Sequence, residues 1–220
     1  MAFDYCSREY AMLNRPIETD RHFTRVSRFL GPRPHDRLLE IGCGRGFLTA
    51  RVQRHVPDTR GVDLNPESIA NGVTRDLAVM DAQELAFEDA SFDMIYSFHC
   101  IEHIPDLVRA FREMDRVLKP GGSILLVYPA EPIRGLYVVP TSILVFGNPW
   151  HAREIHLHKL TPRRLRPLLA GTTLTVGRSA LHLLITPQFI TVLRKPTARV
   201  RREHPEERLM ALEVVGSDAP

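Results

Sequence analysis

The sequence predicts a doubly wound α/β fold, with a mostly parallel sheet covered by helices on both faces. Short apolar runs alternate with amphipathic segments along the chain, which is typical of βαβ units. The first apolar run, 37–41, leads into the glycine-rich turn 42–46, and a helical pattern follows at once. The chain has 220 residues, 44% of them hydrophobic, which is enough for one domain with a large core.

The individual elements follow from these patterns in chain order. Strands are expected at 37–41, 59–63, 77–80, 92–98 and 123–128, with two final strands at 174–180 and 189–194. Helices are expected at 47–55, from Pro66, from Asp106 to about Leu118, and from Thr161 with Pro162. Asp106 and Thr161 are expected caps, because their side-chain oxygens can accept free N–H groups at a helix start. The segment 119–122, Lys-Pro-Gly-Gly, is expected to stop the preceding helix.

The charges and the cysteines of the chain argue against several classes of protein. The chain carries 29 basic and 26 acidic side chains, a net charge of +3, which does not indicate a polyanion partner. The three cysteines Cys6, Cys43 and Cys100 form no CxxC pair, so we expect neither a metal site nor a disulfide framework. The first residues are charged where a signal peptide is apolar, and we expect a cytoplasmic location.

The turn from Gly42 through Gly44 to Gly46 joins the first strand to a helix. Glycine permits a tight turn and lets a ligand approach the main chain where a Cβ would collide. The helix start also offers free N–H groups to a polar or anionic group. Phe47 occupies the sixth position, so the spacing is G-x-G-x-G and not the G-x-G-x-x-G of dinucleotide folds. The turn alone fits either a nucleotide-type site or a glycine turn with no ligand.

Two aspartates follow at the ends of the next two expected strands. Asp63 stands where a carboxylate can accept hydrogen bonds from both hydroxyls of a ribose. Asp81 can accept from an exocyclic amino group such as that of adenine. Each aspartate alone would be interpreted as a strand-end cap or a solvated turn residue. Because ligands of such sheets bind along the carboxyl ends of the strands, the turn and both aspartates predict one shared site.

Five segments resemble, in order and at the usual intervals, the motifs of class I S-adenosylmethionine-dependent methyltransferases of the small-molecule type (similar to methyltransferase domain 11). They are Leu38-Leu-Glu-Ile-Gly-Cys-Gly-Arg-Gly46, Gly61-Val-Asp-Leu-Asn65, Met80-Asp-Ala-Gln83, Ser91-Phe-Asp-Met-Ile-Tyr96 and Leu118-Lys-Pro-Gly-Gly-Ser-Ile-Leu-Leu126. The resemblance implies S-adenosylmethionine as the cofactor and a Rossmann-like sheet of seven strands with the last one antiparallel. It also implies methyl transfer to a small, moderately apolar acceptor, at oxygen, nitrogen or carbon.

The resemblance implies a role for each element of the site. Glu40 and the glycines would frame the methionine part of the cofactor, Asp63 would hold the ribose, and Asp81 with Ala82 would meet the adenine. Tyr5 and Tyr10 belong to an N-terminal segment that in such enzymes often folds over the cofactor, so either could cover the methionine part; ordinary helix packing is the alternative for both. The expected cofactor contacts are Tyr10, Glu40, Gly42, Cys43, Gly44, Gly46, Asp63, Leu64, Asp81, Ala82, Gln83 and Ser97.

His99 and His103 follow the strand 92–98, in a loop that faces the acceptor in the resembling family. Holding an acceptor in line with the methyl group supplies much of the acceleration, and a base is needed only for a weakly nucleophilic group such as a hydroxyl. Imidazole titrates near neutral pH, so both histidines are catalytic candidates. The alternative is that they form hydrogen bonds within the loop. No Asn-Pro-Pro-Tyr segment is present, which disfavours a nucleic-acid substrate.

We expect a single domain over residues 1–220. It comprises an N-terminal helical cap (1–35), a cofactor-binding core (36–130), an apolar lid or insert (131–160), a C-terminal helix and strands (161–195) and a charged tail (196–220). The apolar stretch 136–150 has three interpretations, namely a lid over the acceptor, extra core, or a transient membrane contact. His151, His156 and His158 have no cysteine nearby, and no metal ligands are expected among them. The pattern does not predict an oligomeric state.

Two other functions remain as alternatives. A nicotinamide-dependent oxidoreductase would use a related sheet, but it needs a different glycine spacing and a Tyr-x-x-x-Lys or equivalent. A non-catalytic partner subunit would keep the cofactor fold without an open acceptor pocket. The motifs do not determine the methyl acceptor. The acceptor-facing parts of such enzymes are loops, and the fold does not dictate which substrate these loops bind.

Overall fold

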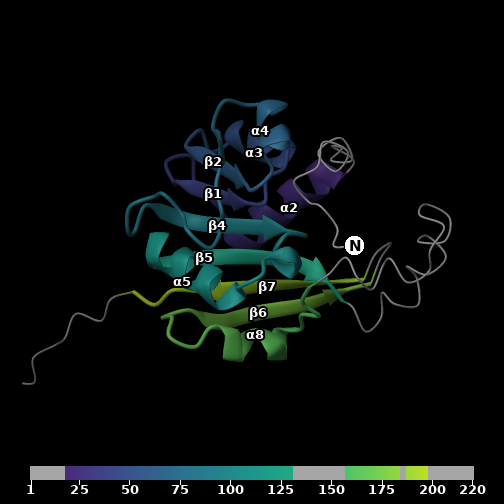
Figure 1. The fold of residues 1–220 in the computed structure, drawn as a ribbon, viewed down its shortest axis with the longest axis vertical. Helices are drawn as coiled ribbons and strands as arrows, with labels where there is room; N and C mark the ends of the chain where they lie inside the picture. Colours follow the sequence, from purple (N-terminus) through teal and green to yellow (C-terminus); the bar gives the residue numbers. More distant parts are fainter. Residues whose placement is uncertain (1–17, 131–156, 184–186, 198–220) are drawn as a thin grey trace, which may run out of the picture.

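The computed structural model describes residues 18–130, 157–183 and 187–197 (Figure 1). In chain order the elements are α2 (Thr19–Leu30), β1 (Leu38–Ile41), α3 (Phe47–Gln53), β2 (Thr59–Asp63), α4 (Pro66–Ala70), β3 (Leu77–Val79), β4 (Phe92–Phe98), the 3₁₀ turn η2 (Ile101–His103), α5 (Leu107–Val117), β5 (Leu118–Pro129), α8 (Pro162–Leu168), β6 (Thr175–His182) and β7 (Gln188–Arg194). The strands within these residues form a seven-stranded sheet in the order β3-β2-β1-β4-β5-β7-β6.

The direction of the strands follows the predicted pattern. The pairs β1–β2, β1–β4, β2–β3 and β4–β5 are parallel. The last strand, β7, runs antiparallel to both β5 and β6. The prediction of a doubly wound, mostly parallel sheet with its last strand antiparallel is therefore confirmed. The order reverses beside β1, where the chain leaves β3 at one edge and re-enters at β4, and ligands of open α/β sheets bind at such a point.

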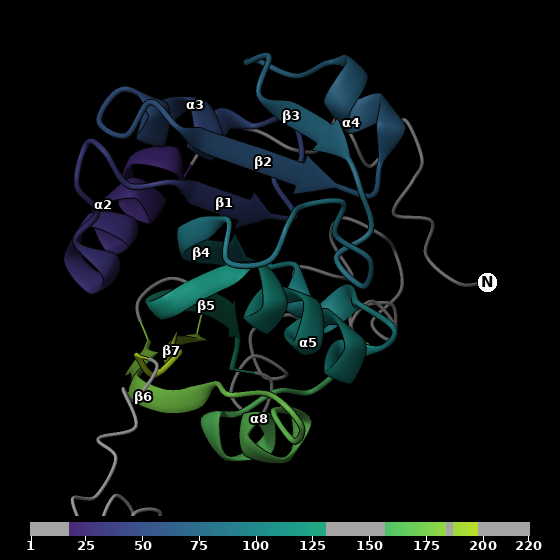
Figure 2. The same ribbon diagram turned by 90° about the vertical axis from the view of Figure 1, so that its left-hand side faces the viewer.

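Helices cover both faces of the sheet (Figures 1 and 2). An apolar layer packs them against each face. On one face, Val26 of α2 and Val52 of α3 pack with side chains of β1, β4 and β5. On the other face, Phe111 of α5 and Leu165 of α8 belong to a larger cluster that includes residues of β1, β4 and β5. The central strands are thus buried on both sides, which explains why their sequences read as continuous apolar runs.

The helix starts agree with the capping residues that the sequence suggests. The Asp106 side chain accepts a hydrogen bond from the backbone N–H of Arg109 at 3.0 Å, and Thr161 accepts from Arg164 at 3.2 Å. Asn65 caps α4 by accepting from the N–H groups of the second and third residues after it. The predicted positions of these helix starts are confirmed.

The segment 119–122 differs from the prediction in one respect. The helix stops where expected, because α5 ends at Val117, but β5 begins directly at Leu118 and not at 123. Leu118 pairs with Phe92 and Ser123 pairs with Met94, so residues 119–122 form an irregular extension opposite a single residue of β4. Lys119 anchors this extension, because its ammonium group lies 2.8 Å from the Asp93 carboxylate.

Several predicted segments fall partly or wholly outside the described residues. These are most of the N-terminal cap, including Tyr10, most of the lid or insert, with the apolar stretch 136–150, and most of the charged tail. The described part of the N-terminal segment contains α2, and the described end of the insert, 157–160, leads into α8. In the described part of the chain, no helix has the length and apolar character to cross a membrane.

The packing predicts that truncating a core side chain lowers the free energy of unfolding far more than truncating a surface side chain. Phe111 is fully buried, so Phe111→Ala should lower the free energy of unfolding by about 3–5 kcal/mol. Leu183 is 60% exposed, and Leu183→Ala should change it by no more than about 0.5 kcal/mol. Urea unfolding followed by circular dichroism measures both values, and a small loss for Phe111→Ala would contradict the packing of α5.

Candidate functional site

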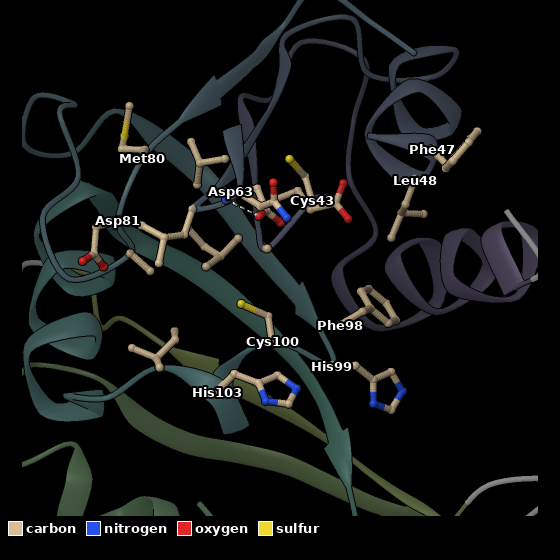
Figure 3. Close-up of a pocket in the computed structure, with 18 of the residues that line it drawn as sticks. Cys43, Phe47, Leu48, Asp63, Met80, Asp81, Phe98, His99, Cys100 and His103 are labelled. Carbon is tan, nitrogen blue, oxygen red and sulfur yellow. Dashed lines mark hydrogen bonds between the residues drawn. The ribbon is translucent and has the colours of Figure 1, made fainter. Parts of the chain in front are cut away.

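A cavity of about 380 Å³ lies over the carboxyl ends of the parallel strands (Figure 3). Its walls come from α2, the β1–α3 turn, the ends of β2 and β3, and the loop after β4. The lining includes these residues expected from the sequence: Glu40, Gly42, Cys43, Asp63, Leu64, Asp81, Ala82, Gln83, His99 and His103. Gly44, Gly46 and Ser97 do not line the cavity, and Tyr10 lies outside the described residues.

The glycine turn has a backbone that other residues rarely adopt. Gly42, Gly44 and Gly46 have φ angles of 75°, 53° and 75°. A Cβ at Gly42 would collide with the Cys100 side chain, and one at Gly46 would lie 2.6 Å from the Leu77 Cδ1. The two outer glycines therefore leave room for protein side chains. From the sequence, the lack of a Cβ at these glycines was expected to make room for a ligand.

Asp63 links the end of β2 to the glycine turn. Its Oδ2 accepts a hydrogen bond from the N–H of Gly44 at 2.7 Å, and its Oδ1 accepts from the N–H of Asn65 at 2.9 Å. Burial raises the pKa of Asp63 above its ordinary value, although these backbone donors act in the opposite direction. The carboxylate thus fixes two loops of the site while it lines the cavity.

Asp81 is held in place by its neighbour Gln83. The backbone N–H of Gln83 donates to Asp81 Oδ1 at 2.8 Å, and the Gln83 amide group lies 3.0 Å from both carboxylate oxygens. The carbonyl oxygen of the same Gln83 side chain accepts from the N–H of Asp106, the cap of α5. This chain of hydrogen bonds ties the cavity wall at the end of β3 to the start of α5.

Glu40 is almost completely buried at the end of β1, with 4% of its surface exposed. Thr49 of α3 donates a hydrogen bond to its Oε2 at 2.5 Å, and the hydroxyl of Tyr96 lies 3.3 Å from the same oxygen. Burial raises the pKa of Glu40 to about 8, with the Thr49 and Tyr96 hydrogen bonds opposing the shift. Glu40 therefore holds a proton at neutral pH in the absence of a cationic partner.

The thiols of the two cysteines in the cavity wall, Cys43 and Cys100, are not ionised at neutral pH. Burial raises the pKa of both the Cys43 and the Cys100 thiol far above the ordinary value, and nearby acidic groups raise it further. A thiol needs to be ionised to act as a nucleophile. These cysteines thus serve the packing of the glycine turn.

The loop after β4 brings two histidines and a glutamate together. His99 has a φ angle of 50°, which is uncommon for a residue other than glycine, while its N–H still donates to Val127 at 2.8 Å. Glu102 Oε1 lies 3.7 Å from Nδ1 of His99 and 3.9 Å from Nε2 of His103. Figure 3 shows the two imidazoles below Cys100, with Asp63 and Asp81 above it. The sequence analysis had proposed both histidines but missed Glu102.

Helix α2 contributes a wall that the sequence analysis did not identify. Glu18, directly before the helix, and Thr19 and His22 within it line the cavity. The His22 ring stacks on Phe98 at a centroid distance of 4.3 Å, and its Nε2 lies 3.1 Å from the Glu18 carboxylate. The spacing of Glu18 and His22, four residues apart, was the available signal, but it is common on solvated helix faces.

Comparison with known proteins agrees with this architecture. Residues 39–126 match the family described as "Methyltransferase domain". A curated relative, the demethylmenaquinone methyltransferase of Staphylococcus aureus strain JH9, is 31% identical over 143 residues. That alignment covers 59% of the chain and 59% of the relative, so less than two thirds of the relative's length is spanned.

Solved structures share the fold at low sequence identity. A putative methyltransferase of Haloferax volcanii, solved with a methyltransferase activator, has a TM-score of 0.67 at 19% identity and covers 86% of this chain and 97% of its own. The geranyl diphosphate C-methyltransferase of Streptomyces coelicolor, solved with Mg²⁺, a geranyl thiolodiphosphate and S-adenosylhomocysteine, has a TM-score of 0.61 at 15% identity, covering 80% and 76%. Residues 39–126 are thus similar to the methyltransferase domain family, and the fold is shared with solved methyltransferase structures.

Glu40 predicts a pH dependence of stability. Its pKa in the folded state, about 8, is higher than its ordinary value, so folding favours the protonated form. The stability that protonated Glu40 contributes to the folded protein is fully present below the ordinary pKa of a glutamate. It is lost as the pH rises through about 8. Relative to Glu40→Gln, the wild type should lose about 1.4 kcal/mol of stability per pH unit across this window.

Urea unfolding of both proteins at several pH values between 5 and 8 measures this difference. Glu84→Gln is the matched control, because the Glu84 side chain is 81% exposed. A constant free-energy difference between wild type and Glu40→Gln would show that Glu40 is ionised in the folded protein.

Proposed function

We propose that this protein transfers the methyl group of S-adenosylmethionine to a small, moderately apolar acceptor. The observation that carries the proposal is the meeting of the glycine turn, Asp63 and Asp81 at one cavity over the switch point of the sheet. The family match and the curated relative support the same activity. The G-x-G-x-G spacing gives no support to a nicotinamide-dependent oxidoreductase.

The residues of the cavity fit this cofactor. The volume of about 380 Å³ lies in the range of small-molecule sites, and two carboxylates stand at separate strand ends on its wall. Asp63 would accept hydrogen bonds from the ribose hydroxyls, and Asp81 with Ala82 would bind the adenine. Glu40, Gly42 and Cys43 would frame the methionine part, whose ammonium group would favour ionised Glu40. When bound, the cofactor supplies an electrophilic methyl group on sulfur.

The other end of the cavity would receive the acceptor. The wall at this end is apolar where it is formed by Phe98, Ile104 and Pro105. The ring nitrogens of three histidines add polar groups to it, namely His22, His99 and His103. Such a mixture binds a molecule that is apolar over most of its surface and polar at the reacting end. The apolar walls would exclude water from this end.

The curated relative and one solved structure support an apolar acceptor. The Staphylococcus aureus relative is named for demethylmenaquinone, and the Streptomyces coelicolor enzyme is named for geranyl diphosphate. Both names describe molecules with long apolar parts. A hydroquinone is accordingly a suitable first probe for this chain.

Binding and transfer assays test the proposed function. Calorimetry should show micromolar binding of S-adenosylhomocysteine and no binding of NADH, because the glycine turn and aspartates suit the former. Transfer of a radioactive methyl group from S-adenosylmethionine to 1,4-naphthohydroquinone tests catalysis. Binding of NADH alone would overturn the proposal, and cofactor binding without transfer to any small acceptor would favour a non-catalytic subunit.

Asp63 provides a residue-specific test of the cofactor site. Asp63→Ala should weaken S-adenosylhomocysteine binding by about 1–3 kcal/mol, because it removes the acceptor of the ribose hydroxyls. Asp89→Ala is the control, since the Asp89 side chain is 79% exposed and lies outside the cavity lining. Calorimetry gives both dissociation constants, and an unchanged value for Asp63→Ala would remove this residue from the site.

A further inference from the structure

We propose that Glu102 is a positioning residue that holds His99 and His103 as a proton-accepting pair, and that the methyl acceptor therefore carries an ionisable hydroxyl. The inference rests on the proposed function, because it concerns the acceptor end of the same cavity. It adds the chemical class of the acceptor and a residue that neither the motifs nor the comparisons identify. Its evidence is the geometry, the burial and the charges of the loop after β4.

The carboxylate of Glu102 stands between the two imidazoles. Oε1 lies 3.7 Å from His99 Nδ1 and 3.9 Å from His103 Nε2, and both histidines line the cavity. The Glu102 side chain is only 2% exposed, and neither of its oxygens accepts a hydrogen bond from the residues that the structure describes. An ionised carboxylate buried in this way is costly unless a positive charge lies beside it. A proton on either imidazole supplies that charge.

The charges around Glu102 favour its ionised form. Burial alone would raise the pKa of Glu102, but His99 and His103 lower it below the ordinary value. The Cys100 thiol also faces this carboxylate and stays neutral, because burial raises its pKa. The glutamate therefore acts as a fixed negative charge behind the two imidazoles.

His22 is a third imidazole of the cavity, and its own carboxylate neighbour is Glu18, 3.1 Å from its Nε2. It lies 6.3 Å from His99 between ring centroids, on the opposite wall formed by α2. Burial and the neighbouring charges of His99 and Arg25 lower its pKa to about 4, while Glu18 acts in the opposite direction. His22 therefore stays neutral at physiological pH.

The loop keeps the pair in place through its backbone. His99 occupies a left-handed conformation, with a φ angle of 50°, and such strain persists only where the surroundings enforce it. The N–H of His158 donates to the carbonyl oxygen of Glu102 at 3.1 Å, and its ring lies 2.8 Å from the carbonyl oxygen of Ile104. Contacts from a distant part of the chain thus fix the turn that carries Glu102.

A proton-accepting pair suits a hydroxyl acceptor. As the new bond to the methyl carbon forms, the acceptor hydroxyl loses its proton to a ring nitrogen of His99 or His103, and the S–C electron pair stays with sulfur. The new bond forms at the hydroxyl oxygen or, in a phenol or hydroquinone, at a ring carbon; in the second case the proton of that carbon passes to the oxygen through solvent as aromaticity returns, so one proton in total remains on the imidazole. The Glu102 carboxylate stabilises the imidazolium that results, without itself touching the acceptor.

Histidine titration by NMR tests the pair directly, in protein saturated with S-adenosylhomocysteine. In Glu102→Gln, the pH midpoints of the His99 and His103 ring signals should fall by about 1–3 pH units, because the stabilising charge is gone. Glu84→Gln, an exposed glutamate with the same chemical change, should leave both midpoints at their wild-type values. Unchanged midpoints in a folded Glu102→Gln protein would overturn the proposal.

A second variant keeps the test decisive if Glu102→Gln does not fold. Asparagine tolerates the left-handed backbone at position 99, so His99→Asn should fold. With its competitor removed, His103 alone pairs with Glu102, and the His103 midpoint should rise. A His103 midpoint that does not move would show that the two rings do not share the carboxylate.

The acceptor class has its own readout. With 1,4-naphthohydroquinone as acceptor, the acid limb of the pH profile for kcat should move to lower pH in Glu102→Gln and stay in place in Glu84→Gln. An unshifted profile, or transfer only to acceptors without a hydroxyl, would overturn the assigned class. Loss of S-adenosylhomocysteine binding in the wild type would instead overturn the proposed function, while the NMR midpoints still decide the role of Glu102.

Discussion

The parallel pairing of β1 with β2 on one side and β4 on the other is the constraint on which the site depends. It brings the glycine turn after β1, Asp63 at the end of β2 and His99 just after β4 to a single edge of the sheet. The strands on either side continue the same direction, so the end of β3 adds Asp81 to that edge. A change in the register of β1 would separate these groups, and the cavity would lose its polar ends.

Within that frame, buried carboxyl groups give the cavity regions of different character. Glu40 is shielded and hydrogen-bonded by Thr49 and Tyr96, so it carries a proton at neutral pH. Asp63 accepts two backbone N–H groups, which oppose the effect of its burial. Glu102 is buried beside two imidazoles and stays ionised. The same residue type thus holds a proton in one place and stabilises a cation in another.

The sequence predicted most of the fold, because its signals are local and periodic. Asp106 and Thr161 marked helix starts, and the strands 59–63 and 92–98 have the predicted bounds. The predicted start of β5 was wrong, because the proline and glycines of 119–122 indicated a break between the helix and the strand. In the structure these residues form an irregular extension that pairing with β4 and the ion pair of Lys119 with Asp93 hold in the strand.

The sequence by itself determined the order of the elements, the residues at the strand ends and the similarity of residues 39–126 to the methyltransferase domain family. Each of these depends on residues adjacent in the chain, or on a strand direction that the βαβ pattern already fixes. Tertiary structure alone decided that Cys100 fills the space beside Gly42, that His22 forms a wall of the cavity, and that Glu102 lies between His99 and His103. Those contacts depend on burial and on side-chain packing across elements, which periodicity in a sequence does not record.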